Sequence, residues 1–333
     1  MIDFRSLNKS NKVFVIAEIG NNHEGKFTNA LKLIAAAKKA GVDAVKFQTY
    51  KTEEFIHPFQ KKRFKKLKKF ELSYEDFYKL SLVTKKNNLK FISTPFDIES
   101  VFFLKKIVDI FKISSGDNNY YDLIEKVISF KIPTIISTGL CSLEDIKQLC
   151  NFLKKKISID KIALLHCISS YPALDKDANL FFIRNLIKNF SSVIGFSDHT
   201  IGKVAPLIAA TLGAKIIEKH FTLDNNFSSF RDHKISLNPK DMKELIKDLK
   251  RFSLMTGVDR KIMSFDEKMN IKSMRRSLYV NKDLEAGHKI LKKDISTLRP
   301  FCCSGPLEIK NFIGKRSKYY IKSFSCLKKI SFK

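Results

Sequence analysis

The chain has 333 residues, of which 44% are apolar, so it is long enough and apolar enough to bury a large core. Its formal net charge of +28 comes from 62 Lys and Arg residues against 34 Asp and Glu residues, distributed over the whole length. Such an even distribution indicates a bias in residue usage, whereas nucleic-acid sites concentrate basic residues on one face. We therefore expect no nucleic-acid partner.

The sequence contains no uncharged apolar run of about 18 residues, the length that a membrane-spanning helix requires. Its first residues, MIDFRSLNKS, lack the apolar centre of a secretory signal. The six cysteines are sparse and show no paired metal-ligand spacing, which favours reduced thiols, and only the adjacent Cys302 and Cys303 are unusual. We expect a cytoplasmic protein with no membrane partner.

Eight short apolar segments rich in Val, Ile and Phe recur along the first 220 residues, separated by segments of helical periodicity. This alternation predicts an α/β fold, a (β/α)8 TIM barrel, because a doubly wound open sheet, the structural alternative, usually has fewer strands. The predicted strands are 13–20, 43–50, 90–97, 110–117, 133–140, 161–167, 192–199 and 214–221.

Two of the intervening helices are predicted in detail. Residues 27–41 predict an amphipathic helix that ends at Gly41, with Leu31, Ile34, Ala35 and Lys38 on its apolar face. The densest basic stretch, residues 61–69, is flanked and interrupted by apolar residues three apart, which predicts an amphipathic helix with a solvated basic face. These apolar residues are Phe64, Leu67 and Phe70.

Polar residues end every predicted strand, and the carboxyl ends of barrel strands are where TIM barrels place their catalytic groups. Lys46 and Lys112 are the most informative, because a buried ammonium group is costly unless an anion meets it. They predict an anionic ligand or a covalent Schiff base. The polar strand ends are Glu18, Lys46, Gln48, Thr94, Lys112, Ser115, Asp117, Ser137, Thr138, His166, Ser169, Ser197, Asp198, His199, Glu218 and His220.

Two histidines end the seventh and eighth predicted strands, which are neighbours about 4.8 Å apart in a barrel. That spacing allows His199 and His220 to share one divalent cation while leaving positions for substrate and water. Each histidine alone would more often make an ordinary polar contact, but their adjacency favours a metal site.

The motifs that carry these residues occur in a characteristic order, and together they resemble the sialic acid synthase family, in particular N-acetylneuraminate and legionaminate synthases. The resemblance implies a metal-dependent transferase that condenses phosphoenolpyruvate with an N-acetylated aldose. The implied products are a nine-carbon 2-keto acid and phosphate, released by C–O cleavage. The motifs are AEIGNNHEG, KFQTY, STPFD, KISSGD, STG, LLHCISSYP, GFSDHT and EKHF.

The resemblance also implies a role for each matching residue. His199 and His220 would bind Mn²⁺ or Mg²⁺, and a carboxylate such as Glu18 or Asp117 would orient or deprotonate the attacking water. The implied phosphoenolpyruvate ligands are Lys46, Thr94, Lys112, Ser115, Ser137, Ser169 and Ser197. The implied sugar contacts are Gln48, Asp117, Tyr171, Asp232 and Arg299.

We predict a barrel domain over residues 1–260, a linker over 261–273 and a second domain over 274–333. The last segment has 15 Lys and Arg residues against four Asp and Glu residues, a net charge of +11. Through RRSLYVNKDLEAGHKI and LRP it resembles the family's small antifreeze-like (SAF) domain. The resemblance implies a domain-swapped homodimer in which Arg299 reaches the partner's active site, although FCCSGP replaces the usual Gly-rich continuation after Arg-Pro.

Two other functions are compatible with parts of the pattern. A TIM-barrel aldolase or lyase would use Lys46 or Lys112 as a Schiff base. A basic protein that binds nucleic acid or anionic surfaces would explain the charge but not the eight polar strand ends. The sugar also stays open between N-acetylmannosamine, its 6-phosphate and a 2,4-diacetamido-6-deoxy hexose, and AEIGNNH and KFQTY favour neuraminate or legionaminate synthases over pseudaminate ones.

Overall fold

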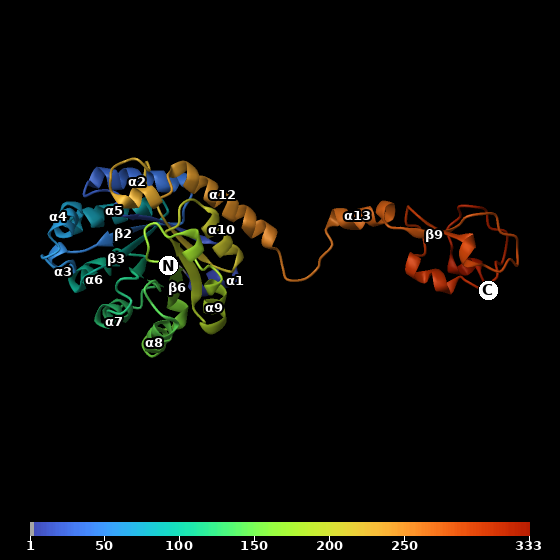
Figure 1. Cartoon of the computed structure of the whole chain (residues 1–333), viewed down its shortest axis with the longest axis horizontal. Helices are drawn as coiled ribbons and strands as arrows, with labels where there is room; N and C mark the ends of the chain where they lie inside the picture. The colour runs from blue at the N-terminus through green and yellow to red at the C-terminus, as the bar shows by residue number, and fades with distance from the viewer. Residues whose placement is uncertain (1–2) are drawn as a thin grey trace. The chain divides into compact units, whose positions relative to one another are not determined.

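All eight predicted strands are present, and they pair in chain order into a closed parallel barrel, which confirms the predicted TIM-barrel fold (Figure 1). The computed structural model describes residues 3–333, and its contacts divide the chain into two units, one ending at Gly257 and one beginning at Val258. The strands are β1 (Phe14–Gly20), β2 (Ala44–Thr49), β3 (Lys90–Pro95), β4 (Ile110–Ile113), β5 (Thr134–Ser137), β6 (Ile162–Cys167), β7 (Val193–Asp198) and β8 (Ile216–His220).

Helices surround the strands of the first unit (Figure 1). None of the helices within residues 3–333 combines the length and apolar composition of a membrane span. The helices of this unit are α1 (Phe4–Lys9), α2 (Phe27–Ala40), α3 (Thr52–Phe55), α4 (Lys61–Phe70), α5 (Tyr74–Lys86), α6 (Ile98–Leu104), α7 (Tyr121–Ser129), α8 (Leu143–Lys154), α9 (Phe182–Asn189), α10 (Val204–Thr211), α11 (Arg231–Ile235) and α12 (Pro239–Thr256), with short 3₁₀ turns at Ile159–Lys161 and Asp175–Asp177.

Helix α2 confirms the predicted segment but corrects its buried face. The helix ends at Ala40, and Gly41 follows it with a φ of 94°, the left-handed conformation that glycine adopts without strain. Its buried side chains include Leu33, Ile34 and Ala37, whereas Ala35 is exposed. The buried face is rotated about the helix axis relative to the predicted one, because the helix packs against the barrel through the row formed by Ala30, Leu33, Ala37 and Ala40.

Helix α4 has the predicted basic, solvated face. All of its lysines are exposed, Phe64 and Leu67 are half-buried, and Phe70 is buried. The ring of Phe70 packs edge-on against Phe230 at 5.3 Å between centroids. The apolar row therefore attaches the helix to the barrel, and its charges lie in solvent as predicted.

The barrel interior has an apolar layer beneath a polar one. Side chains two residues apart on a strand point to the same side, and on seven of the strands an inward apolar residue is followed two positions later by an inward polar residue or cysteine. Phe4 of α1 packs against the apolar layer. The successive pairs are Ile16 and Glu18, Ala44 and Lys46, Ile92 and Thr94, Ile110 and Lys112, Ile135 and Ser137, Leu165 and Cys167, and Ile216 and Glu218.

The second unit has its own small core. Strands β9 (Ser277–Val280) and β10 (Ile295–Leu298) pair antiparallel, and helix α13 (Phe265–Met274) occupies most of the segment predicted as a linker. Further 3₁₀ turns lie at Lys292–Asp294, Pro306–Asn311 and Lys329–Ser331. The core consists of Leu278, Val280, Leu284, Ile290, Phe312, Ile321, Leu327 and Phe332.

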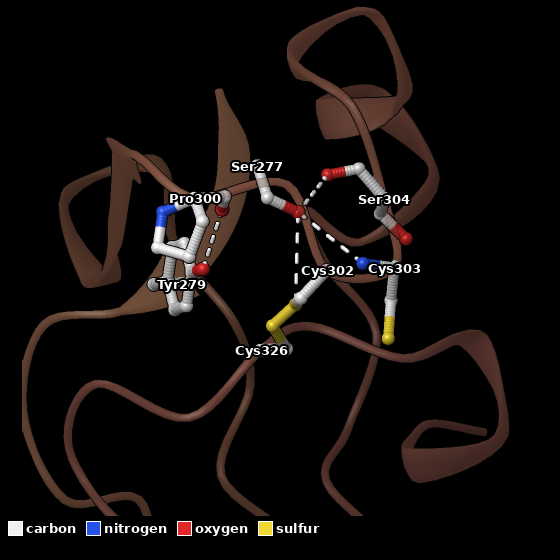
Figure 2. Close-up of a disulfide and its surroundings, with 7 residues drawn as sticks. All are labelled: Ser277, Tyr279, Pro300, Cys302, Cys303, Ser304 and Cys326. Carbon is white, nitrogen blue, oxygen red and sulfur yellow. Dashed lines mark hydrogen bonds between the residues drawn. A yellow bond between two sulfur atoms is a disulfide. The ribbon is translucent and has the colours of Figure 1, made fainter. Parts of the chain in front are cut away.

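A disulfide joins Cys302 to Cys326 in this unit (Figure 2). The expectation of reduced thiols was therefore wrong for these two residues. Sequence spacing did not reveal the pair, because the two cysteines are 24 residues apart and meet only when both flank β9. The other four cysteines are free thiols.

Candidate active site

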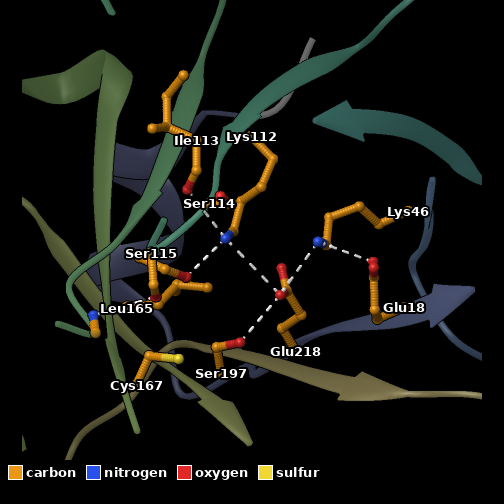
Figure 3. A network of polar contacts seen from close by, with 12 residues as sticks. Glu18, Lys46, Lys112, Ile113, Ser114, Ser115, Leu165, Cys167, Ser197 and Glu218 are labelled. Carbon is orange, nitrogen blue, oxygen red and sulfur yellow. Dashed lines mark hydrogen bonds and ion pairs between the residues drawn. The ribbon is translucent and has the colours of Figure 1, made fainter. Parts of the chain in front are cut away.

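Four buried charges meet at the carboxyl ends of the barrel strands (Figure 3). Lys46 Nζ lies 2.8 Å from Glu18 Oε2 and 3.4 Å from Glu218 Oε1. Lys112 Nζ lies 3.8 Å from the same Glu218 oxygen. Glu218 therefore bridges the two lysines, and the cluster spans β1, β2, β4 and β8.

The burial of Lys46 and Lys112 therefore does not by itself require the anionic ligand or Schiff base that the sequence predicted. Glu18 and Glu218 supply two negative charges from the protein itself, which offset much of the cost of burying the ammonium groups. A third barrel lysine, Lys219, is equally buried but points to the other side of β8, where it pairs with Asp198 at 2.6 Å. Strand alternation thus separates a structural lysine from the two lysines of the interior.

The protonation of the cluster is not symmetrical. Burial and the negative charge of Glu218 raise the pKa of Glu18 from its ordinary value of 4.5 to about 7, against the opposing attraction of Lys46. Burial would also raise the pKa of Glu218, but Lys112 and Lys46 outweigh it and lower that pKa. When Glu18 is protonated, the single carboxylate of Glu218 faces the two lysine ammonium groups, and the cluster then has more positive than negative charge.

Two neutral hydrogen-bond acceptors also hold the ammonium group of Lys112. Its Nζ donates hydrogen bonds to Ser137 Oγ at 2.6 Å and to the Ile113 carbonyl at 3.2 Å. Burial lowers the pKa of Lys112, with the Lys46 charge adding to the effect and Glu218 opposing it. Ser197 Oγ donates to Glu218 Oε1 at 3.0 Å (Figure 3). Two of the predicted serines, Ser137 and Ser197, therefore belong to the same network.

Ser115 and Ser169 converge on Gly139 beside this network. The Gly139 backbone N–H donates to Ser115 Oγ at 3.2 Å. A Cβ atom at position 139 would lie 2.4 Å from Ser169 Oγ and 2.6 Å from Ser115 Oγ, closer than real contacts allow. Glycine at position 139 therefore makes room for both hydroxyl groups. Within residues 3–333, the Ser169 hydroxyl makes no hydrogen bond.

The two predicted metal ligands are neighbours. The rings of His199 and His220 lie 5.4 Å apart between centroids, and Glu18 is in register with His220 on the adjoining strand. His199 Nδ1 lies 2.7 Å from the Ile168 carbonyl, so it donates there and leaves Nε2 available. His220 Nδ1 is buried and makes no hydrogen bond in the described part of the chain, while burial lowers the pKa of His220 and keeps its imidazole neutral. Burial is outweighed at His199 by its hydrogen bond and charge interaction with Cys167, which raise the pKa of that imidazole. The available Nε2 of His199 and the neutral ring of His220 fit two metal-binding imidazoles.

Residues predicted to contact the sugar lie around this histidine pair. The Tyr171 ring lies 4.1 Å from the His199 ring, and the Arg231 guanidinium lies over Tyr171 at 4.8 Å from its centroid. Arg231 Nε is 3.3 Å from Asp232 Oδ1. Tyr171 and Asp232 are therefore linked through Arg231, which the sequence interpretation did not single out.

The other predicted residues have separate positions. Gln48 accepts a hydrogen bond from Asn21 at 2.9 Å and is in register with Thr94, whose buried hydroxyl makes no hydrogen bond within residues 3–333. Asp117 accepts a short hydrogen bond from Ser114, and burial raises its pKa. Arg299 belongs to the second unit, where its Nε donates to the Met274 carbonyl at 2.7 Å.

Glu218 and Cys167 lie among the central residues of the site, but the sequence analysis gave neither of them a functional role. Both were present in quoted motifs, and their i, i+2 spacing from inward apolar residues was a usable signal. Cys167 Sγ lies 3.8 Å from His199 Nδ1, and the pKa of its thiol is lowered because His199 outweighs the opposing effect of burial.

Cavities occur at both ends of the barrel. One of about 520 Å³, at the carboxyl ends of β5 and β6, includes Thr138, Cys167 and Ser169 in its lining. A larger one of about 720 Å³ lies at the amino ends of β1 and β2, lined by Leu7, Val15 and Leu249 among others. The larger cavity contains none of the predicted site residues, so volume alone does not locate the site.

A closed (β/α)8 barrel with buried charges at the carboxyl ends of its strands is the architecture of a TIM-barrel enzyme. Residues 33–261 match the NeuB family, and the chain belongs to that family. It is accordingly an enzyme related to the sialic-acid-type synthases, and the resemblance identified from its motifs is confirmed.

Three comparisons define the relationship. The chain is 37% identical over 321 residues to the N,N'-diacetyllegionaminic acid synthase of Legionella pneumophila, covering 91% of this chain and 90% of that protein. It is 33% identical over 342 residues to a pseudaminic acid synthase of Campylobacter jejuni, covering 98% of each. The crystal structure of the N-acetylneuraminic acid (sialic acid) synthetase of Leptospira borgpetersenii, in complex with citrate, superposes with a TM-score of 0.74 at 36% identity, covering 78% of this chain and 90% of that one.

Proposed function

We propose that the chain condenses phosphoenolpyruvate with an N-acetylated aldose to give a nine-carbon 2-keto acid and phosphate. The observation that carries the proposal is the interior cluster of Lys46, Lys112, Glu18 and Glu218 beside the histidine pair, in a member of the NeuB family. Its excess positive charge suits an anionic substrate, and its serine hydroxyls add neutral donors for phosphate and carboxylate oxygens.

The reaction forms one carbon–carbon bond and breaks one carbon–oxygen bond. The methylene carbon of phosphoenolpyruvate attacks the open-chain aldehyde, a water molecule adds to the enol carbon, and phosphate leaves from that carbon. In this scheme Lys46 and Lys112 bind the substrate charges, and Ser115, Ser137, Ser169 and Ser197 position its oxygens. Glu18 holds or accepts the water proton, because its pKa of about 7 suits proton transfer near neutral pH.

His199 and His220 would hold the divalent cation, Mn²⁺ or Mg²⁺, in this proposal. The available Nε2 of His199 and the neutral imidazole of His220 support the assignment. When bound, the ion would supply Lewis-acid polarisation of the aldehyde oxygen. Tyr171 packs against His199 and would orient the sugar next to it.

We propose N-acetylmannosamine or a 2,4-diacetamido-6-deoxy hexose as the sugar. The higher identity to a legionaminic acid synthase than to a pseudaminic acid synthase, 37% against 33%, favours the neuraminate or legionaminate type, as do the motifs AEIGNNH and KFQTY. Gln48, Tyr171 and Asp232 are the barrel residues proposed to contact it.

The direct experiment measures phosphate release from phosphoenolpyruvate with a panel of N-acetylmannosamine, its 6-phosphate and the diacetamido sugars. We expect release only when phosphoenolpyruvate, one of these sugars and Mn²⁺ or Mg²⁺ are all present, together with a nine-carbon 2-keto acid by mass spectrometry. No release with any sugar of the panel contradicts the proposed reaction.

A Schiff-base aldolase is the second candidate, because the lowered pKa of Lys112 is a property of lysines that attack carbonyl groups. Borohydride in the presence of pyruvate distinguishes the two reactions. A covalent adduct on Lys112 or Lys46 and loss of activity would support the aldolase, whereas we expect full activity and no adduct.

We also propose that residues 274–333 form an antifreeze-like domain that acts in a domain-swapped homodimer. The motifs RRSLYVNKDLEAGHKI and LRP and the separate core of the second unit support this part of the proposal. Arg299 would contact the sugar, since its planar guanidinium donates to several oxygens at once.

A further inference from the structure

Three cysteine side chains gather on the second unit, far along the sequence from the barrel residues described above. The sulfur atoms of Cys302, Cys303 and Cys326 all lie within 4.8 Å of one another. Cys302 and Cys326 form the disulfide, and Cys303 is an exposed free thiol next to it (Figure 2). Within residues 3–333 this is the one group of three or more His, Cys, Asp or Glu side chains placed to share an ion.

Strand β9 holds both cysteine segments in place. On one side, Leu278 N–H and Ser277 Oγ donate to the Ser304 carbonyl at 2.9 and 2.7 Å, which fixes the turn that contains Cys302 and Cys303 (Figure 2). On the other side, Leu327 N–H donates to the Leu278 carbonyl at 2.9 Å, next to Cys326. Because Ser277, Leu278 and Leu327 are fully buried, the proximity of the three sulfur atoms is a consequence of the fold.

The spacing suits a thiophilic cation. Thiolates bind Zn²⁺ at about 2.3 Å, so sulfurs around one tetrahedral ion lie roughly 3.8 Å apart. Cys302 and Cys303 are exposed and Cys326 is half-buried, so in the reduced chain rotation about their χ1 angles would suffice to bring the three sulfurs to that separation. Thiolate donors select Zn²⁺ or Cu⁺ over the hard cations Mg²⁺ and Mn²⁺.

Charge and access favour the same ligand. Three thiolates around Zn²⁺ carry a net negative charge, and the surrounding segment 274–333 has a net charge of +11, from 15 Lys and Arg residues against four Asp and Glu residues. Cys302 and Cys303 are exposed, so an ion reaches the site from solvent without opening the core.

We propose that the reduced chain binds one thiophilic cation of the Zn²⁺ class through Cys302, Cys303 and Cys326. The disulfide and the metal-bound cluster are then alternative states of one site. A dithiol reductant supplies the two electrons and two protons that convert the disulfide into two thiols, and the three thiols release their protons when the ion binds. Either state ties the segment after Pro300 to the last turn of the chain.

The test uses the full-length chain, reduced and kept free of oxygen, with Co²⁺ as a spectroscopic substitute for Zn²⁺. Thiolate-bound Co²⁺ gives a sulfur-to-cobalt charge-transfer band, which imidazole ligands do not give. We expect the band to saturate at one equivalent per chain, to disappear when Zn²⁺ is added, and to be absent from the disulfide form.

Matched variants locate the ion. Cys302→Ser, Cys303→Ser and Cys326→Ser should each weaken Co²⁺ binding by about tenfold or more, since each removes one of three ligands. Cys141→Ser and Cys167→Ser should leave the band unchanged. Thermal unfolding of every variant checks the fold, and Cys303→Ser, which changes an exposed free thiol, is informative even if loss of the disulfide destabilises the other two.

Three outcomes would overturn the proposal. One is the absence of a charge-transfer band in the reduced chain. Another is a band that persists in Cys302→Ser, Cys303→Ser and Cys326→Ser. The third is a band lost in Cys167→Ser, because the ion would then be bound beside His199 in the barrel.

Discussion

Glu18 on β1 is in register with Lys46 on β2, and their side chains meet at 2.8 Å inside the barrel. The contact joins a carboxyl group whose pKa is raised to about 7 to a lysine whose pKa is raised by Glu18 and Glu218 despite its burial. Lys46 is therefore the permanent cation of the pair, and Glu18 is the group that exchanges a proton.

Lys46→Met and Lys112→Met should each raise the KM for phosphoenolpyruvate far more than the KM for the sugar. Loss of one charge-assisted hydrogen bond costs about 1.5–3 kcal/mol, or roughly 10- to 150-fold in substrate affinity. Lys219→Met is the matched control, because it also removes a fully buried lysine with a carboxylate partner but lies outside the interior cluster. Equal effects of all three variants on the two KM values would contradict an anion-binding role.

Glu18 should make the protein less stable as pH rises from about 4.5 to about 7. Because its pKa is raised on folding, the native state binds more protons than the unfolded state in this window, so the free energy of unfolding falls with pH and levels off above it. The upper limit is about 3 kcal/mol, since one pKa unit corresponds to about 1.4 kcal/mol. Melting temperatures of Glu18→Gln should fall less over this range than those of the wild type or of the exposed control Glu54→Gln. A Glu18→Gln profile parallel to that of the wild type would mean that Glu18 does not titrate there.

Removal of divalent cations should abolish turnover, and Mn²⁺ or Mg²⁺ should restore it. His199→Ala and His220→Ala should lose both activity and the ability to be restored, because each removes a proposed ligand. His166→Gln is the control, since His166 lies on neighbouring β6 but bonds to the Ala178 carbonyl at 2.8 Å. Full activity of chelator-treated, metal-free wild type would rule out a catalytic ion.

Gly139→Ala should weaken phosphoenolpyruvate binding and destabilise the fold by about 1–3 kcal/mol, the usual cost of overpacking. The new methyl group would displace Ser115 and Ser169, whose hydroxyls lie 2.6 and 2.4 Å from its position. Gly116→Ala is the matched control, because its methyl group would meet only Ser114 Oγ, at 3.7 Å. Chemical denaturation and the KM for phosphoenolpyruvate measure the two effects, and a Gly139→Ala enzyme identical to Gly116→Ala would show that the serines adapt freely.

Arg299 should act on the active site of the partner subunit. Arg299→Ala and His220→Ala chains are each expected to be inactive alone, whereas their co-expression should restore part of the activity, since one mixed site then combines an intact barrel with an intact arginine. Purified mixed dimers provide the measurement, and co-expression of His199→Ala with His220→Ala, which damages both barrels, is the negative control. Mixed dimers of Arg299→Ala and His220→Ala that are as inactive as their parents would place Arg299 in its own chain's site or outside any site.

Local sequence pattern predicted the barrel and much of its candidate site. Alternation of apolar strand segments and amphipathic helices is repeated eight times, and strand periodicity requires that Ile110 and Lys112, or Ile135 and Ser137, face the same side. The helix over residues 27–41 was equally predictable, but its rotation was wrong because packing against the barrel, which involves distant residues, selected Leu33 and Ala37 over Leu31 and Ala35.

The sequence by itself determined the fold class, the family and the set of polar residues at the strand ends, because these depend on short-range periodicity and on ordered motifs. Only the tertiary structure decided which charges meet. Barrel closure between β1 and β8 places Glu18 beside His220, and Glu218 reaches both Lys46 and Lys112 from the last strand. The Cys302–Cys326 pairing was decided in the same way, because contacts between residues distant in sequence arise from strand pairing that no local pattern encodes.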